Sequence, residues 1–150
     1  MRTPACLAIL ALLTVALPTN AAVITVGTGG DHATIAAAIA AAADGDTIDV
    51  FAGTYTESGL TWNSKKLTIQ GQGARNTILD ANNLGRMFDD FDGNTATSGP
   101  TLTLRDLTIQ NASGTGDGGT IVPNVNDSVE AYNVTFKDNT ATQDGGVFGG

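Results

Sequence analysis

The sequence contains one stretch twice, with an offset of 27 residues and no gap. Residues 105–121 read RDLTIQNASGTGDGGTI, and residues 132–148 read YNVTFKDNTATQDGGVF. The positions that are identical in both copies are Thr108/Thr135, Thr115/Thr142, Asp117/Asp144, Gly118/Gly145 and Gly119/Gly146. A repeat of this length is typical of a solenoid, in which each unit buries its apolar face only by stacking on its neighbours. The rest of the chain is therefore expected to precede, cap or decorate such a stack.

Short β-prone runs, separated by clusters of Gly, Asn, Asp and Ser, occupy the chain from residue 46 onward. Apolar and polar residues alternate in them with a period of two, which is the pattern of strands. The tetrapeptide LTIQ at 67–70 recurs at 107–110, as a further echo of the repeat. No helix-like segment separates these strands, so a wound coil is expected in place of βαβ crossovers.

Two successive coils can be drawn, and strands in equivalent positions would pair in parallel about 4.8 Å apart. Their expected strands are 87–89, 101–104, 107–110, 119–122, 128–131 and 134–137. The side chains expected inside are Leu102, Leu104, Leu107, Ile109, Val129, Val134 and Phe136. Those expected to face water are Thr103, Thr108, Gln110, Glu130 and Lys137. A period near 27 gives four to five coils.

Residues 31–43 are expected to form a helix that caps the first coil. Asp31 can cap its amino end, and alanine, the best helix former, dominates the segment. Ile35 and Ile39 lie one turn apart on a single face, and Gly45 can end the helix in the left-handed conformation. Such a weakly amphipathic helix suits a lid on an apolar surface.

Residues 1–22 are expected to be a secretory signal peptide. A basic start at Arg2, an apolar run at 7–17 and a small-residue exit form the pattern of such a leader. The apolar run is too short to span a bilayer, and no second stretch is long enough. The single cysteine, Cys6, lies in the leader, so the mature chain would have no disulfide. The expected organisation is a leader at 1–22, a strand and capping helix at 23–46, and coils at 47–150.

The chain is acidic, with a formal net charge of −8. Removal of Arg2 with the leader would leave six basic and fifteen acidic residues, a net charge near −9. This charge argues against nucleic acid, which rewards a basic face, and against acidic membrane surfaces. It also disfavours an acidic polymer unless Ca²⁺ bridges the two. Solubility outside the cell is the simpler explanation of the charge.

Residues 33–57, which read ATIAAAIAAAADGDTIDVFAGTYTE, resemble the opening of right-handed parallel β-helix proteins with the pectin-lyase-like superfold. A capping helix, a Gly-Asp turn, a first strand and G-T-Y-x-E follow one another in that opening. The resemblance continues through 67–82 and 102–111. It implies an all-β, right-handed parallel β-helix with an N-terminal capping helix. It does not imply one activity, because the superfold hosts lyases, hydrolases, esterases, adhesins and surface proteins.

The second copy of the repeat resembles a more specific signature. Residues 136–139 (FKDN) and 145–148 (GGVF) are similar to the F-x-x-N and G-G-A-I of polymorphic outer-membrane protein repeats, which occur in bacterial surface proteins. Val147 and Phe148 replace Ala-Ile, and the first copy has QNA at 110–112 instead of F-x-x-N. The resemblance implies a secreted or outer-membrane-surface module with a binding or scaffold role. Its partner would be a polysaccharide or a host or cell-surface ligand.

An enzymatic alternative stays open, namely the amino-terminal part of a pectate lyase-like or pectin methylesterase-like protein. Residues 53–57 (GTYTE) resemble the G-x-Y-x-E of pectin methylesterases, and Gln143-Asp144 falls near the position of their Q-D-T-L acid. An aspartyl esterase needs both an acid and a nucleophilic carboxylate, and at most one can be argued here. Asp144 lies in a D-G-G stretch, which favours a turn residue.

A calcium site can be predicted from one oxygen-rich cluster between two strands. Its residues are Asp89, Asp90, Asp92 and Asn94. Hard oxygen ligands suit Ca²⁺, as lyases of this fold use, but the spacing is not that of an EF-hand because Thr95 stands where glycine is needed. The alternative is a solvated surface loop. Arg75, Arg86 and Arg105 are candidate bases, each expected at an outward strand or turn position.

The second copy of the repeat stops at Gly149-Gly150 without a capping element. Natural solenoids close their ends, because an open strand edge invites pairing with other chains. We therefore expect these residues to be a fragment of a longer protein, cut within a coil.

Overall fold

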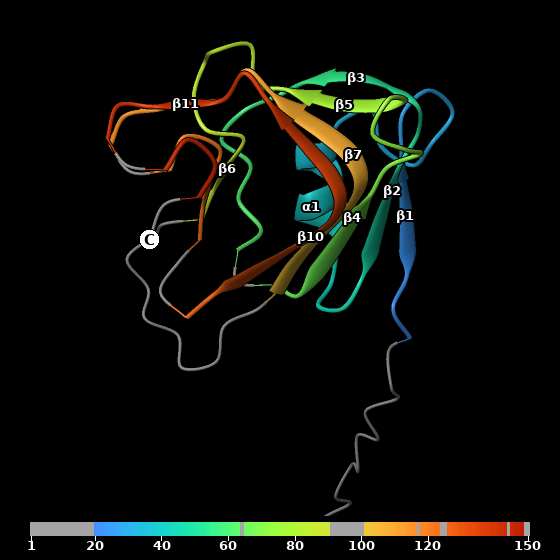
Figure 1. Ribbon diagram of the computed structural model, residues 1–150. Coiled ribbons are helices and arrows are strands. Elements are labelled where there is room, and N and C mark those ends of the chain that lie inside the picture. Colours follow the sequence, from blue (N-terminus) through green and yellow to red (C-terminus); the bar gives the residue numbers. More distant parts are fainter. Residues whose placement is uncertain are drawn as a thin grey trace, which may run out of the picture.

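The computed structural model describes residues 20–63, 65–90, 101–116, 118–123, 126–143 and 145–148. Within them the chain winds into a parallel β-helix of about four turns, which confirms the fold predicted from the sequence (Figure 1). Its elements are β1 (Val23–Val26), α1 (Ile35–Ala41), β2 (Thr47–Val50), β3 (Gly53–Thr56), β4 (Leu67–Gln70), β5 (Thr77–Asp80), β6 (Phe88–Asp89), β7 (Thr101–Gln110), β8 (Ser113–Gly114), β9 (Ile121–Val122), β10 (Ser128–Lys137) and β11 (Thr140–Ala141).

The paired strands named above all run parallel, and they form three faces of the coil. On the first face β1, β2, β4 and the first halves of β7 and β10 follow one another. On the second face β3, β5 and the second halves of β7 and β10 do so. The short strands β6 and β9 begin the third face. Because β7 and β10 each run through two faces, each replaces the two separate short strands that the sequence predicted.

The bend within each long strand depends on one residue in the left-handed conformation. Asp106 in β7 has φ of 53°, and Asn133 in β10, one coil further on, has the same value. Asp and Asn tolerate this conformation better than other residues with a side chain. The Asn133 amide also donates to the Asp106 carboxylate over 2.6 Å. Equivalent corners are thereby stacked and joined from coil to coil.

The register between β7 and β10 confirms the repeat. Val134 pairs with Leu107 and Phe136 with Ile109, and β11 pairs with β8 at the same offset of 27 residues. The earlier coils have other lengths. Aligned positions of β2, β4 and β7 differ by 21 and then 35 residues, as the pairs Ile48↔Ile69 and Ile69↔Leu104 show.

The two LTIQ tetrapeptides are therefore not equivalent. The first, β4, pairs with Leu102–Arg105 in the first half of β7, whereas the second is the other half of β7 and lies beside β5. The reason is physical: any strand with one buried face reads as alternating apolar and polar residues, so the tetrapeptide reports burial and not position in the coil.

A pair of glycines holds the turn that precedes the third face. Gly118 has φ of 70° and Gly145, its equivalent, has 75°. A Cβ on Gly119 would lie 2.0 Å from the carbonyl oxygen of Thr140 in the next coil. Gly119 therefore has no room for a side chain, and Gly118 and Gly145 have φ values that favour glycine.

The core lies inside the coil, as predicted for the first copy of the repeat. Leu102, Leu104, Leu107 and Ile109 are fully buried. Val129, Val134 and Phe136 in the second copy pack against this core but are only partly buried. The prediction for Thr108 is wrong, since it is 7% exposed. Its hydroxyl donates to the carbonyl of Ala74, in the loop between β4 and β5 that covers this position.

The helix α1 is shorter than predicted and begins at Ile35. Its N-cap is Thr34, whose side chain accepts a hydrogen bond from the Ala37 N–H. The prediction that Asp31 caps the helix is wrong. Its carboxylate accepts hydrogen bonds from the Thr25 N–H and hydroxyl instead.

The apolar face of α1 is buried against the coil. Ile35, Ala38 and Ile39 form this face, and Figure 1 shows the helix within the outline traced by β4, β7 and β10. Lys65 donates from Nζ to the Ile39 carbonyl over 2.9 Å and so satisfies one of the free carbonyls near the helix end. No helix in the described ranges is long and apolar enough to cross a membrane. The predicted leader falls almost wholly on residues 1–19, which lie outside those ranges.

Candidate functional site

The G-T-Y-T-E stretch at 53–57, which raised the esterase alternative, has a structural role. The Tyr55 hydroxyl lies within hydrogen-bond distance of the Val26 and Phe51 carbonyls, at 3.2 and 3.1 Å. Burial, followed by the nearby charge of Glu57, raises the pKa of Tyr55, so its hydroxyl stays a donor at neutral pH.

Glu57 caps the helix α1. One carboxylate oxygen accepts from the Ile35 N–H over 2.8 Å, and the other accepts from the Ala36 N–H over 2.9 Å. The first backbone N–H groups of a helix have no partner within the helix, and a negative charge there also favours its dipole. Both oxygens of Glu57 are therefore engaged by the fold. The stretch joins the first coil to its lid.

Arg86, one of the candidate bases, is likewise engaged by the fold. Its guanidinium donates to the Gly118 and Thr115 carbonyls over 2.8 and 3.0 Å. It also pairs with the Asp89 carboxylate at 3.0 Å. These contacts tie β6 to the turn of the following coil. Arg75 is exposed in the turn before β5, in keeping with its expected position.

The predicted calcium ligands are only partly within the described residues. Asp89 pairs with Arg86 as above, and Asp90 is 4% exposed. Asp90 accepts hydrogen bonds from the Thr61 hydroxyl and the Asn63 N–H. Asp92 and Asn94 lie outside the described ranges, as does Asp144. Within those ranges no three His, Cys, Asp or Glu side chains gather in a way that could hold a metal ion. The calcium site stays a prediction.

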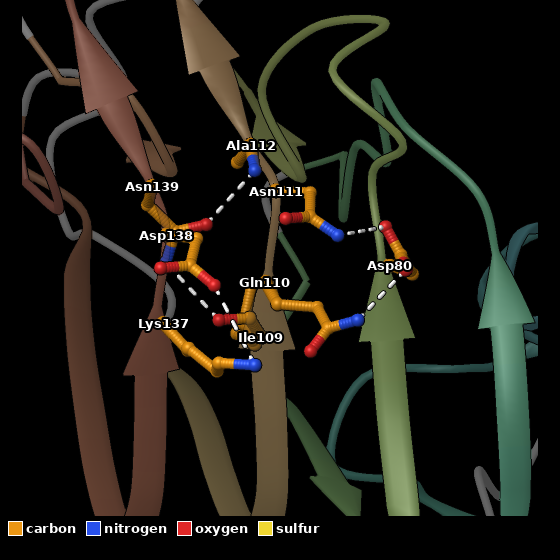
Figure 2. Close-up of polar contacts among 8 residues, drawn as sticks. All are labelled: Asp80, Ile109, Gln110, Asn111, Ala112, Lys137, Asp138 and Asn139. Carbon is orange, nitrogen blue, oxygen red and sulfur yellow. Dashed lines mark hydrogen bonds and ion pairs between the residues drawn. The ribbon is translucent and has the colours of Figure 1, made fainter.

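Asn139, the asparagine of the F-x-x-N signature, joins two coils (Figure 2). Its side-chain oxygen accepts from the Ala112 N–H over 2.9 Å, and its side-chain nitrogen donates to the Ile109 carbonyl over 3.0 Å. One amide thus satisfies a donor and an acceptor of the preceding coil at the corner after β7. The phenylalanine of the signature, Phe136, packs against the core. In this chain the two residues of the signature therefore hold neighbouring coils together.

A second polar cluster surrounds Asp80 at the end of β5 (Figure 2). Its carboxylate accepts from Gln110 over 2.7 Å and from the Asn111 side chain over 3.0 Å, and the Asn82 N–H adds a third bond. Burial by itself raises the pKa of Asp80, but these hydrogen bonds outweigh it and lower the pKa below its usual value. Asp80 is therefore an ionised acceptor that holds neighbouring strands together. Sequence reasoning missed this cluster, because Asp80 and Gln110 are 30 residues apart.

Three cavities lined by described residues are open to solvent. One, of about 300 Å³, lies beside α1 near Glu57 and Leu60, and another, of about 600 Å³, lies between Gly27 and Tyr55. A third, of about 270 Å³, lies beside Arg86 and Asp89. Trp62 is fully buried in edge-to-face contact with Phe88, with ring centres 6.5 Å apart, so its ring is not available to a ligand.

The outward side of the first face carries a row of long polar side chains. Arg105 and Tyr132 occupy paired positions of β7 and β10, and the guanidinium carbon lies 4.2 Å from the centre of the tyrosine ring. Sequence reasoning missed this contact, although the repeat aligns these residues as its first pair. A cation stacked on an aromatic face is a typical way of holding an arginine side chain in place.

The parallel coil, its capping helix and its stacked corners define the chain as a pectin-lyase-like parallel β-helix protein. The model of the family described as "Putative pectate lyase-like adhesive domain" matches residues 32–147, which is well over half of the chain. The chain belongs to this family. No curated protein and no solved structure matches it.

Proposed function

We propose that this chain is a secreted or cell-surface binding module with an adhesin-like scaffold role. The observation that carries the proposal is that the polar residues of the sequence motifs make hydrogen bonds that hold the fold together. Glu57 caps a helix, Arg86 joins two coils, and Asn139 closes a corner. What these contacts leave outward is a set of long, regular strand faces, which suit binding more than chemistry.

Two further findings support this role. The family to which the chain belongs is described as an adhesive domain, and most of the strands join in one seven-stranded parallel sheet. A rigid parallel sheet holds outward side chains at fixed spacing, so a ligand meets a preorganised surface and less ordering is needed on binding. Secretion through the leader, and a location at the cell surface, belong to the same proposal.

Adhesion can be tested directly with the full chain attached to fluorescent beads. The proposal expects beads to be retained on bacterial or host-cell surfaces, and soluble protein to compete for that retention. Beads coated with the heat-unfolded protein serve as the control. Retention equal to this control would contradict the proposal.

The enzymatic alternative is tested with the same protein on pectin and polygalacturonate in the presence of Ca²⁺. Ultraviolet absorbance of unsaturated products measures lyase activity, and methanol release measures esterase activity. The proposal expects neither signal to exceed that of the unfolded protein. Clear turnover of either kind would replace the binding role with an enzymatic one.

A further inference from the structure

One row of side chains crosses the outward side of the first face at equivalent positions of successive strands. Its members are Thr25, Asp49, Gln70, Arg105 and Tyr132. Neighbouring strands lie about 4.8 Å apart, so the stretch from Asp49 to Tyr132 spans about 14 Å along the coil axis. Four consecutive members end in planar polar or aromatic groups. The row therefore offers regularly spaced hydrogen-bonding groups on a flat sheet.

Arg105 differs from Arg86 in what its guanidinium contacts. Arg86 donates to two carbonyls and pairs with a carboxylate. Arg105 lies against the Tyr132 ring, and its guanidinium makes no hydrogen bond or ion pair with the described residues. A guanidinium carries five N–H donors in a fixed fork. Arg105 is thus oriented by stacking while its donors stay available to a ligand.

The residues beside Arg105 in the row also present polar or aromatic groups that a ligand can contact. Tyr132 is 47% exposed, and its hydroxyl is held by Glu130 at 3.2 Å. Asp49 is held by the Gln72 amide at 2.7 Å. The Gln70 amide, between Asp49 and Arg105, has no hydrogen-bond partner among the described residues. An amide both donates and accepts, so the row combines donors, acceptors and one aromatic surface.

A second row runs beside the first and is made of shorter side chains. Thr47, Thr68 and Thr103 occupy paired positions of β2, β4 and β7, with Glu130 next in line on β10. The threonines form a low strip of hydroxyl groups alongside the longer planar groups. The two rows together make a shelf parallel to the coil axis, and an extended ligand can lie along it.

The charges of the shelf select among ligands. Arg105 is its one cation, and Asp49 and Glu130 stand on either side of it along the coil. The whole chain carries a formal net charge of −8. A polyanion would be repelled by this surface, whereas a neutral chain of hydroxyl groups can both donate to and accept from it. Its carbon-bound hydrogens also match the exposed part of the Tyr132 ring.

From this juxtaposition we infer that the outward shelf of β2, β4, β7 and β10 binds a neutral polysaccharide laid along the coil axis. Arg105 and Gln70 hydrogen-bond its hydroxyl groups, and Tyr132 packs against a sugar ring. This inference rests on the proposed binding role and names its surface and ligand class. It also predicts that the shelf does not bind an acidic polysaccharide such as pectate.

The test measures retardation of the full chain in native gels that contain a soluble polysaccharide. The neutral probes are a β-glucan, a xylan and a mannan, and the acidic probes are polygalacturonate and alginate. We expect at least one neutral probe to retard the protein and the acidic probes to have no effect. Tyr132→Ala should weaken the neutral interaction about tenfold, the factor expected for the loss of one good contact.

Two matched variants complete the design. Arg105→Lys keeps the charge but removes the planar fork, so it should also weaken binding. Lys137 lies at the far end of β10, the strand that carries Tyr132, and outside the shelf, so Lys137→Ala should bind like the wild type. Thermal unfolding and circular dichroism of each variant show whether its fold is retained, and Arg105→Lys preserves the test if Tyr132→Ala fails to fold.

The inference is overturned if both shelf variants bind like the wild type, or if only the acidic probes retard the protein. It is also overturned if no probe binds. In each of these cases the bead assay on cells decides separately whether the chain is a binding module with its surface elsewhere.

Discussion

The two copies of the repeat share a pattern of apolar and polar residues but have different surroundings. Leu107 and Ile109 in β7 are fully buried, whereas their partners Val134 and Phe136 in β10 are only partly buried. Within the described residues, β7 pairs with β4 and β5 on one side and with β10 on the other, while β10 pairs with β7 alone. Among the described residues, the burial of each copy therefore follows the number of strands that its own strand pairs with.

The largest effect expected from this comparison is on the stability of the core. Leu107→Ala removes a fully buried side chain between two coils and should cost about 2–5 kcal/mol of unfolding free energy. Val134→Ala, its match in the next coil, should cost about 1 kcal/mol. Urea unfolding followed by circular dichroism measures both. Equal costs would show that the two copies are equally buried in solution.

The capped end of the stack provides the next test. Glu57→Ala leaves the Ile35 and Ala36 N–H groups of α1 without their acceptor, and should cost about 1–2 kcal/mol. Glu57→Gln keeps an acceptor and should cost less. Thermal unfolding of the three proteins orders them. An unchanged midpoint for Glu57→Ala would mean that this cap does not contribute to stability.

The corner between the two copies depends on Asn139. Asn139→Ala leaves the Ala112 N–H without its acceptor and removes one donor from the Ile109 carbonyl, so a cost of about 1–2 kcal/mol is expected. Asp138, one residue earlier, has φ of 55°, which asparagine tolerates as well as aspartate, so Asp138→Asn removes only an exposed ion pair with Lys137 and should have little effect. A larger loss for Asp138→Asn than for Asn139→Ala would contradict this role for the signature asparagine.

The smallest expected effect is on the pH dependence of stability, through Asp80. The hydrogen bonds around Asp80 lower its pKa in the folded state, so this carboxylate stabilises the fold above the ordinary aspartate pKa of about 3.9. The contribution is lost as the pH falls through the lowered value. Asp80→Asn should therefore be less stable than the wild type at pH 7, with the difference shrinking in acid. A difference that grows as the pH falls would have the wrong sign.

Much of the fold could be predicted because it follows from periodicity. The two-residue alternation located most strands, and the 27-residue offset gave the β7–β10 register. The opening helix, its isoleucine face and the inward residues of the first copy were also correct. These features depend on which residues avoid water, and that preference is visible in a single sequence.

The remaining features depend on contacts between distant coils. The sequence could not show that Thr34 and not Asp31 caps the helix, because the hydrogen bonds between Asp31 and Thr25 in β1 appear only in the folded chain. Thr108 was expected to face water, because the sequence does not show that another loop covers it. The roles of Glu57 and Arg86 were equally hidden, since the backbone groups that they contact lie 21 to 32 residues away. The Arg105–Tyr132 stack, in contrast, was available from the repeat alignment.

Hydrogen exchange measured strand by strand tests the central claim that position in the stack decides how the repeat behaves. Amides of β7 are flanked by coils on both sides and should exchange slowly, near the rate of global unfolding. Amides of β10 should exchange faster, although the two strands share their sequence pattern. Equal protection of the two strands in the full chain would contradict the account.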